Sequence, residues 1–324
     1  MGPRIKVSFE ELVAQLDSPD FVIRRNATRD LGKLKDKRAI PYLLAMLKDK
    51  TINVRSRAVV ALGRQNDSAV IEPLIEILKD SHCHVHRPAF EALEKFGPEA
   101  VLPLCAALQH KNQYIVQSSI LLLGRIGDKR AVEPLLQMLG DPRLDFRRLA
   151  IYALGELRDR RAVDALLEAL EDETLRLHAA RALGQVGDPR ALQPLLSHLD
   201  DESPRIKQVV IESLGVFGMK EAALPLIGVL KSPNLIERQY AALSLGQIGD
   251  PVAVEPLIAL LDDPDIWVSA EAVVALGKLR ARQALPQLEE MKARLLHTEG
   301  QLNFNQQALH KVLLNAISLI RESK

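Results

Sequence analysis

Histidine and cysteine side chains gather at one place in the sequence, the segment His82-Cys83-His84-Val85-His86. Imidazole nitrogens and a thiolate are ligands that Zn²⁺ prefers, and on a helix His82 and His86 would lie about one turn apart. A zinc site is therefore the first chemistry to weigh. Whether these side chains can converge depends on the elements that carry them, and the spacing of other residues indicates those elements.

Two residue patterns recur along the 324-residue chain at steps of about 31 residues. The first is a proline, at Pro41, Pro73, Pro103, Pro134, Pro194, Pro225, Pro256 and Pro286, with Ala165 in the one gap. The second is a Leu-Gly pair, which ends at Gly32, Gly63, Gly124, Gly155, Gly184, Gly215, Gly246 and Gly277. Two spacings that agree over the whole chain predict about ten structural repeats.

Each repeat has the pattern of two amphipathic helices. In residues 128–157, Asp128 precedes a first helix (the A helix), Gly140-Asp141-Pro142 predicts a turn, and apolar residues then recur at helical spacing on a second helix (the B helix). Neither helix can bury its apolar stripe alone, so stacked pairs share a core. The sequence predicts an all-α, right-handed α-solenoid that forms a single domain over residues 1–324.

The two ends of the chain have patterns typical of caps. Ser8 and Glu11 form a capping box ahead of the first helix, so the N-terminal cap begins at about residue 8. A last amphipathic helix is expected at about 306–322, after one long connection over about 297–305.

Three segments carry a family resemblance: Val54-Arg55…Ala61-Leu62-Gly63, Phe146-Arg147…Ala153-Leu154-Gly155, and Gly187-Asp188-Pro189-Arg190-Ala191-Leu192. They resemble the HEAT-like repeats named after phycobilin lyases, and the likeness covers about residues 8–322. It implies that the B helices line a concave face and that an Asp/Arg ladder supports the fold. Deoxyhypusine hydroxylase is similar in fold and binds di-iron through His-Glu pairs, but this sequence has no His-Glu dipeptide.

The ladder residues occupy two fixed positions relative to the Leu-Gly glycine. The arginines, eight residues before it, are Arg24, Arg55, Arg147, Arg176 and Arg238. The aspartates, four residues after it, are Asp36, Asp67, Asp128, Asp159, Asp188 and Asp250. They could bind phosphate or acidic ligands. We favour a structural ladder in which each arginine bonds carbonyls and these aspartates, which also cap the A helices.

The same register argues against the zinc site. Cys83 occupies the position that Phe21 and Ile52 hold in other repeats, so we expect it to be buried, and His86 takes the place of a ladder arginine. At most two ligands remain, so we expect no metal and no cofactor. Residues 82–126 also depart from the repeat pattern, for example at Glu94 and Pro98, and both a functional cause and sequence drift stay open.

Outward positions of the B helices define the expected binding surface on the concave face. Its residues are Arg87, Tyr114, Gln117, Leu121, Arg148, Tyr152, Leu177, Arg181, Ile236, Leu243 and Trp267. Aromatic and arginine side chains are frequent anchors of protein interfaces. Trp267 with Ile236 and Leu243 predicts an exposed apolar patch, unless the superhelix or the long C-terminal connection covers it.

Composition narrows the function. Basic and acidic residues nearly balance at 43 and 42, which disfavours a polyelectrolyte partner, and two cysteines without a signal or membrane-spanning segment favour the cytoplasm. We expect a non-catalytic scaffold that binds a protein or peptide, with the oligomeric state open. The alternatives are a phycobilin-lyase-like or chaperone-like accessory to an enzyme, and nucleic-acid binding by concave arginines, which Glu91, Asp145 and Glu212 interrupt.

Overall fold

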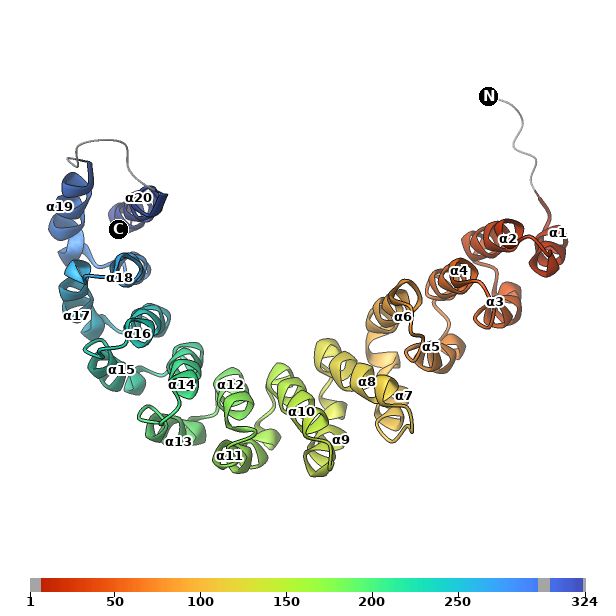
Figure 1. The fold of residues 1–324 in the computed structure, drawn as a ribbon, viewed down its shortest axis with the longest axis horizontal. Coiled ribbons are helices and arrows are strands. Elements are labelled where there is room, and N and C mark those ends of the chain that lie inside the picture. Colours follow the sequence, from red (N-terminus) through yellow and green to blue (C-terminus); the bar gives the residue numbers. More distant parts are fainter. Residues whose placement is uncertain (1–6, 297–303, 323–324) are drawn as a thin grey trace. The chain divides into compact units, whose positions relative to one another are not determined.

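The computed structural model describes residues 7–296 and 304–322 (Figure 1). Within these ranges the chain forms twenty α-helices and no strand, and the helices follow one another as ten A–B pairs. The predicted α-solenoid of about ten helix pairs is confirmed. The helices group into two compact units, Met1–Leu157 and Arg158–Lys324. A single domain over residues 1–324 stays a prediction.

The first unit contains five pairs. Its A helices are α1 (Phe9–Ala14), α3 (Ile40–Met46), α5 (Ile71–Ile77), α7 (Val101–Ala107) and α9 (Val132–Gln137). Its B helices are α2 (Phe21–Leu34), α4 (Ile52–Leu62), α6 (Cys83–Phe96), α8 (Gln113–Ile126) and α10 (Leu144–Leu157). The predicted capping box is confirmed, because the Glu11 N–H donates to Ser8 Oγ and the Ser8 N–H donates to the Glu11 carboxylate.

The second unit repeats this arrangement. Its A helices are α11 (Val163–Glu171), α13 (Leu192–Ser197), α15 (Ala223–Val229), α17 (Val254–Ala259) and α19 (Leu285–Leu296). Its B helices are α12 (Arg176–Val186), α14 (Pro204–Phe217), α16 (Leu235–Ile248), α18 (Ile266–Lys278) and α20 (Phe304–Glu322). In Figure 1 these B helices lie side by side along the inner side of this unit. The expected C-terminal helix is α20, and most of the connection before it lies outside the described residues.

Tertiary packing holds these short helices. Most A helices span six or seven residues, too few to be stable alone in water. In the repeat that contains α9 and α10, Leu135 from the A helix and Phe146, Ala150 and Leu154 from the B helix are all buried. Each pair thus contributes one apolar stripe from each helix to a core that neighbouring pairs share. No helix in the described part of the chain is long and apolar enough to cross a bilayer.

The Leu-Gly glycines mark the places where consecutive B helices touch. A Cβ atom added to Gly63 would lie 2.8 Å from the Cβ atom of Ala92, and one added to Gly184 would lie 2.8 Å from the Ser213 carbonyl oxygen. A side chain at either position would therefore collide with the next B helix. The recurring glycine is required by close helix packing.

The junction between α6 and α8 departs from this rule. Glu94 replaces the glycine, and Leu122 occupies the position that alanine or serine holds in the other B helices from α4 to α18. These two helices pack less extensively than the other consecutive B helices of the first unit. An Arg125–Glu94 ion pair, with Nη1 and Oε2 3.5 Å apart, spans the junction. The glycine and its small partner are thus lost together.

Candidate partner-binding surface

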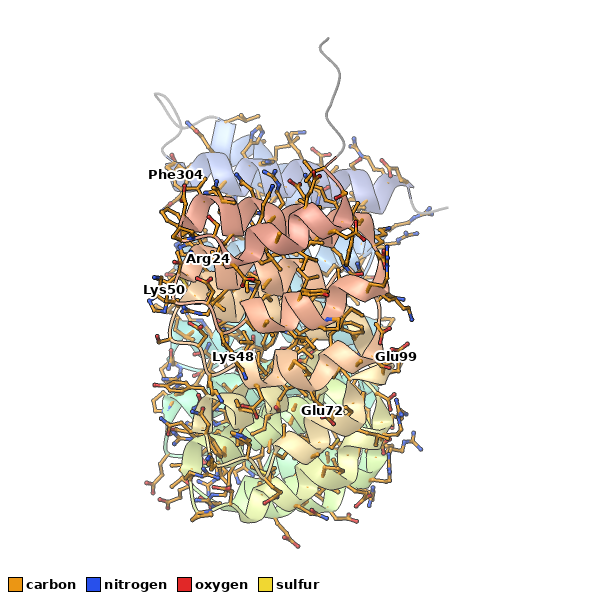
Figure 2. All side chains as sticks on the ribbon, turned by 90° about the vertical axis from the view of Figure 1, so that its right-hand side faces the viewer. Arg24, Lys48, Lys50, Glu72, Glu99 and Phe304 are labelled. Atoms are coloured by element: carbon orange, nitrogen blue, oxygen red, sulfur yellow. The ribbon has the colours of Figure 1, made fainter. Side chains whose placement is uncertain are left out.

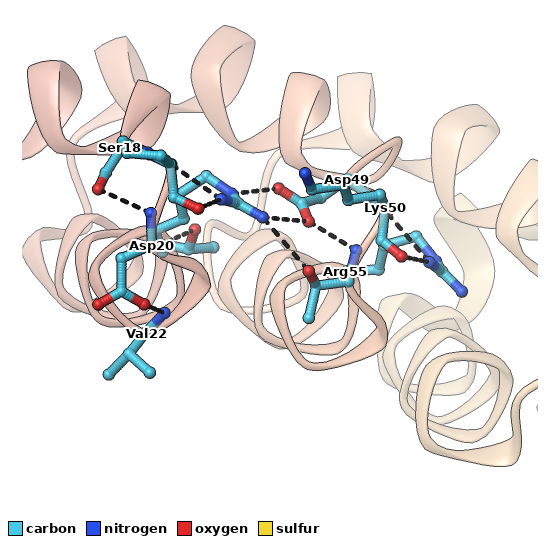
Figure 3. A network of polar contacts seen from close by, with 10 residues as sticks. Ser18, Asp20, Val22, Asp49, Lys50 and Arg55 are labelled. Carbon is cyan, nitrogen blue, oxygen red and sulfur yellow. Dashed lines mark hydrogen bonds and ion pairs between the residues drawn. The ribbon is translucent and has the colours of Figure 1, made fainter.

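Arg24 lies near the start of α2 and joins two successive repeats. Its guanidinium donates to both Asp49 carboxylate oxygens, from Nε at 2.7 Å and from Nη2 at 3.1 Å, and to the carbonyl oxygens of Ser18 and Pro19. The Asp49 carbonyl oxygen in turn accepts from Arg55 at 3.0 Å (Figure 3). Asp49 therefore links one ladder arginine to the next.

Three other ladder arginines also pair with an aspartate of the next repeat. Arg55 pairs with Asp80, Arg176 with Asp201, and Arg238 with Asp263, always 25 residues later in the chain. The expected bonds to carbonyl oxygens are confirmed, but the expected aspartate partners are wrong. The true partners lie in the turn between the A and B helices of the next repeat.

The expected aspartates lie too far away to pair with the ladder arginines. Asp36 follows the C-terminus of α2, whereas Arg24 lies near its N-terminus, and a helix of 14 residues is about 21 Å long. Figure 2 shows Arg24 and Lys50 at one edge of the first unit and Glu99, which follows α6, at the opposite edge. Asp36 instead accepts the Arg38 N–H at 2.9 Å and caps a 3-10 turn that leads into α3.

The other five predicted capping aspartates make the same backbone bond two residues on. These are Asp67, Asp128, Asp159, Asp188 and Asp250. Their capping role is confirmed, although each caps a 3-10 turn rather than the A helix itself. The cap lets the chain turn sharply from one repeat into the next.

Two opposing effects act on the pKa of Asp49. Burial alone would raise the pKa, but the hydrogen bonds from Arg24 and from the Thr51 N–H favour the carboxylate more strongly, so the pKa lies below its usual value. The pKa values of Asp80 and Asp263 are lowered in the same way, against burial, by Arg55 and Arg238 and by one backbone N–H each. These aspartates are charged in the folded protein at neutral pH.

The side chains of the histidine segment at the start of α6 contact different neighbours. Cys83 is exposed, so the expectation that it is buried is wrong. It is the first residue of α6, where the apolar register of the helix interior does not yet apply. His86 Nε2 lies 3.1 Å from Ser118 Oγ on α8, and His82 Nδ1 lies 3.2 Å from Asp80. Among the described residues, no three His, Cys, Asp or Glu side chains are grouped to hold a metal.

In the first unit, the predicted surface residues lie on α6, α8 and α10. Tyr114 and Tyr152 are exposed, while Gln117 and Leu121 are half-buried. Arg87 on α6 is exposed and donates to Glu91 at 2.8 Å. Arg148 lies 3.8 Å from Asp145. This face therefore combines exposed aromatic rings with locally paired arginines.

In the second unit, a hollow of about 510 Å³ lies over α12, α14 and α16. It brings together three predicted residues, Leu177, Arg181 and Ile236. Its other lining residues are Pro204, Arg205, Gln208, Val209 and Asn234. Leu243 on α16 and Trp267 on α18 are not among its lining residues, although Trp267 is exposed. We call this hollow the α12–α16 groove.

The sequence contained signals for the residues that the predictions omit. Asp49, Asp80, Asp201 and Asp263 recur in the A-to-B turns at the repeat spacing, which could have identified them as arginine partners. Arg205 and Gln208 occupy outward positions of a B helix, as Arg181 does. Pro204 is the first residue of α14 and Asn234 directly precedes α16, and both line the groove. The spacing of outward positions within a helix does not predict residues at a helix start.

Comparisons with solved structures find the same fold. A chain of a complex of Kap95p with RanGDP aligns with 97% of this chain and 52% of its own, at 14% identity and a TM-score of 0.69. Kap121p aligns with 96% of this chain and 41% of its own, at 14% identity and a TM-score of 0.66. This chain thus spans about half or less of these proteins. Human deoxyhypusine hydroxylase aligns over 84% of this chain at 26% identity, with a TM-score of only 0.35.

The sequence comparisons identify the family. No curated protein matches the sequence. A model of HEAT repeats matches residues 9–94, 71–152, 101–176, 132–215, 164–234 and 223–294, which together cover most of the chain. The stacked helix pairs and the glycine junctions agree with this match, and the chain belongs to the HEAT-repeat family.

Proposed function

We propose that this chain is a non-catalytic cytoplasmic scaffold that binds a protein or peptide on the face formed by its B helices. The observation that carries the proposal is the exposure of large side chains at outward positions of these helices. Tyr114 is 56% exposed, Tyr152 41% and Trp267 45%. Exposed aromatic side chains near arginines are typical anchors of protein interfaces.

The binding partners of similar proteins support this proposal. Kap121p has been solved bound to Pho4p, to Ste12p, to Nup53p and to the extreme C-terminus of the protein phosphatase Cdc14p. Helical arrays of this kind therefore bind protein partners. In this chain we assign the binding surface to the outward B-helix positions of each unit, the positions that face inward in a curved HEAT array.

Nucleic-acid binding by the outward arginines has less support. Arg87 pairs with Glu91 at 2.8 Å, and Arg181 pairs with Glu212 at 3.3 Å. Carboxylates interleaved with the arginines weaken the field that many phosphate contacts would need. An accessory role like that of the phycobilin lyases stays an alternative, and mixing with a bilin and its apoprotein would test it by a visible absorbance shift.

Quantitative affinity capture from the native host tests the scaffold proposal. The variant carries Tyr114→Ala, Tyr152→Ala and Trp267→Ala together. We expect its partners to be depleted at least about tenfold relative to the unchanged protein, because the loss of each anchor typically costs 1–2 kcal/mol or more, roughly. Circular dichroism checks that the variant keeps its helices.

A matched control removes exposed apolar side chains from A helices instead. It carries Tyr42→Ala, Leu102→Ala and Leu224→Ala, all of which are exposed. The control should retain every partner. If the B-helix variant retains every partner too, or if the control loses the same ones, the assignment of the B-helix face is wrong.

A further inference from the structure

The α12–α16 groove has only one sign of charge. Its two charged lining residues are Arg181 on α12 and Arg205 on α14, and no carboxylate lines it. Gln208 and Asn234 add amide groups, and the remaining lining residues are apolar. An anionic group that enters the groove therefore meets two guanidinium groups, and the carboxylate beside Arg181, that of Glu212, does not line the groove.

Both arginines can bind a new partner. Arg205 is exposed and forms no ion pair or side-chain hydrogen bond within the described parts of the chain. Arg181 pairs with Glu212 at 3.3 Å between Nη2 and Oε2, and the Arg181 side chain is 53% exposed and that of Glu212 36%. Such surface pairs contribute little free energy, so Arg181 can exchange Glu212 for a carboxylate of a ligand.

The groove also offers an apolar anchor point. Leu177, Val209 and Ile236 come from three successive B helices and line the same hollow. Val209 is buried, while Ile236 keeps 39% of its surface exposed. A volume of about 510 Å³ accommodates a few side chains of a peptide. An apolar side chain seated here would remove the exposed part of Ile236 from water, which is favourable.

A hollow in the first unit differs from the α12–α16 groove in the charges that line it. It has a volume of about 790 Å³ and lies between α3 and α5. Its lining includes Lys48 and Lys79 but also Glu76 and Asp80, and Lys79 already pairs with Glu76 at 2.6 Å. Mixed and internally paired charges give that hollow no preference for either sign. Charge therefore distinguishes the α12–α16 groove from this hollow.

We propose that the α12–α16 groove binds an acidic peptide segment, with an apolar side chain on Leu177, Val209 and Ile236 and flanking carboxylates on Arg181 and Arg205. This inference rests on the proposed scaffold function and names the chemistry of the partner. It places the acidic segment across α12, α14 and α16 rather than along one helix.

Fluorescence anisotropy with two labelled peptides tests the inference on the full chain. One probe is a 12-residue peptide of glutamates around two leucines, and the other has lysines in place of the glutamates. We expect the glutamate probe to bind and the lysine probe not to bind. Arg181→Gln with Arg205→Gln should weaken the glutamate probe about tenfold or more, equal to about 1.4 kcal/mol. Raising the salt concentration should weaken it as well.

A control of equal charge loss uses Lys220→Gln with Lys231→Gln, two exposed residues outside the groove in the same unit. This control should bind the glutamate probe as the unchanged protein does. The inference is overturned if neither probe binds, if the lysine probe binds equally well, or if both double variants weaken binding alike. These outcomes leave the scaffold proposal standing as long as the aromatic triple variant loses its captured partners.

Discussion

Arg238 and Asp263 form a two-point ion pair across 25 residues of chain, with Nε 2.8 Å from Oδ2 and Nη2 3.0 Å from Oδ1. Arg238 also donates to the carbonyl oxygens of Ser232 and Pro233. One guanidinium thus fixes the turn before its own helix and the turn of the next repeat. This structural role accounts for the recurrence of the arginine along the chain.

The Arg238–Asp263 pair should couple strongly in a double-mutant cycle. We expect Arg238→Ala and Asp263→Ala each to destabilise the second unit, with a coupling free energy of about 1.5–3 kcal/mol, the range for hydrogen bonds to charged groups. Urea unfolding followed by circular dichroism measures this. The neighbouring Arg294–Asp262 pair is exposed and serves as the control, with coupling near zero. Equal coupling in both pairs would contradict a structural ladder.

The ladder aspartates should make stability depend on acid pH. The folded-state pKa values of Asp49, Asp80 and Asp263 are lowered, so the stability that they contribute is complete above the unfolded pKa of about 3.9. It is lost as the pH falls through the folded-state values. A triple Asp→Asn variant should therefore be less stable at pH 6 and approach the unchanged protein below about pH 4. Thermal midpoints over this pH range provide the measurement, and a difference independent of pH would refute the assignment.

Adding one methyl group at a glycine junction should be harmful only where the helices touch. Gly184→Ala would force Cβ to within 2.8 Å of the Ser213 carbonyl oxygen, so we expect a loss of about 1–3 kcal/mol. Gly228 lies in α15 with no atom within 4 Å of an added Cβ. Gly228→Ala should therefore stabilise the helix by about 0.5–1 kcal/mol. Urea unfolding should therefore give a lower midpoint for Gly184→Ala and a higher midpoint for Gly228→Ala than for the unchanged protein. If both midpoints move in the same direction, the packing explanation is wrong.

The two cysteines should react at different rates with a thiol reagent. Cys83 is exposed at the start of α6, whereas Cys105 on α7 is half-buried and burial raises the pKa of its thiol. A higher pKa leaves less reactive thiolate at neutral pH. Time-resolved labelling with a maleimide should modify Cys83 first, as mass spectrometry of the Cys83→Ser and Cys105→Ser variants would show. Faster labelling of Cys105 would contradict both the burial and the pKa.

The repeat spacing alone predicts most of the fold. The Leu-Gly spacing predicts the B helices because the glycine is needed where consecutive B helices pack closely, and the junction between α6 and α8 is the exception. Register also predicted that Tyr114, Tyr152 and Trp267 lie outside the core, and all three are exposed. Their role in binding is still a prediction. The capping role of Asp36 could be predicted because a cap acts over two residues.

Contacts between repeats were harder to predict. Arg24 binds Asp49 of the following repeat and not Asp36. The length of α2 separates Arg24 from Asp36, and the spacing of residues along the sequence does not show this distance. Cys83 shows the second limit, since it is the first residue of its helix and is exposed, as Phe21 and Leu235 are at the same position of their repeats. The α12–α16 groove depends on Pro204 and Asn234 at helix beginnings, so its shape follows from how three helices meet.

The paired change at Glu94 and Leu122 decides where this chain can be shortened. Deleting the repeat with α13 and α14 would bring Gly184 against Ser244, a small residue like the Ser213 that it meets now. Deleting the repeat with α5 and α6 would bring Gly63 of α4 against the larger Leu122 of α8. Deleting the repeat with α7 and α8 would bring Glu94 of α6 against Ala153 of α10, where a glycine is needed. The repeat with α13 and α14 can therefore be removed without a clash at the new junction, whereas the repeats with α5–α6 and with α7–α8 can be removed only together, which brings Gly63 against Ala153.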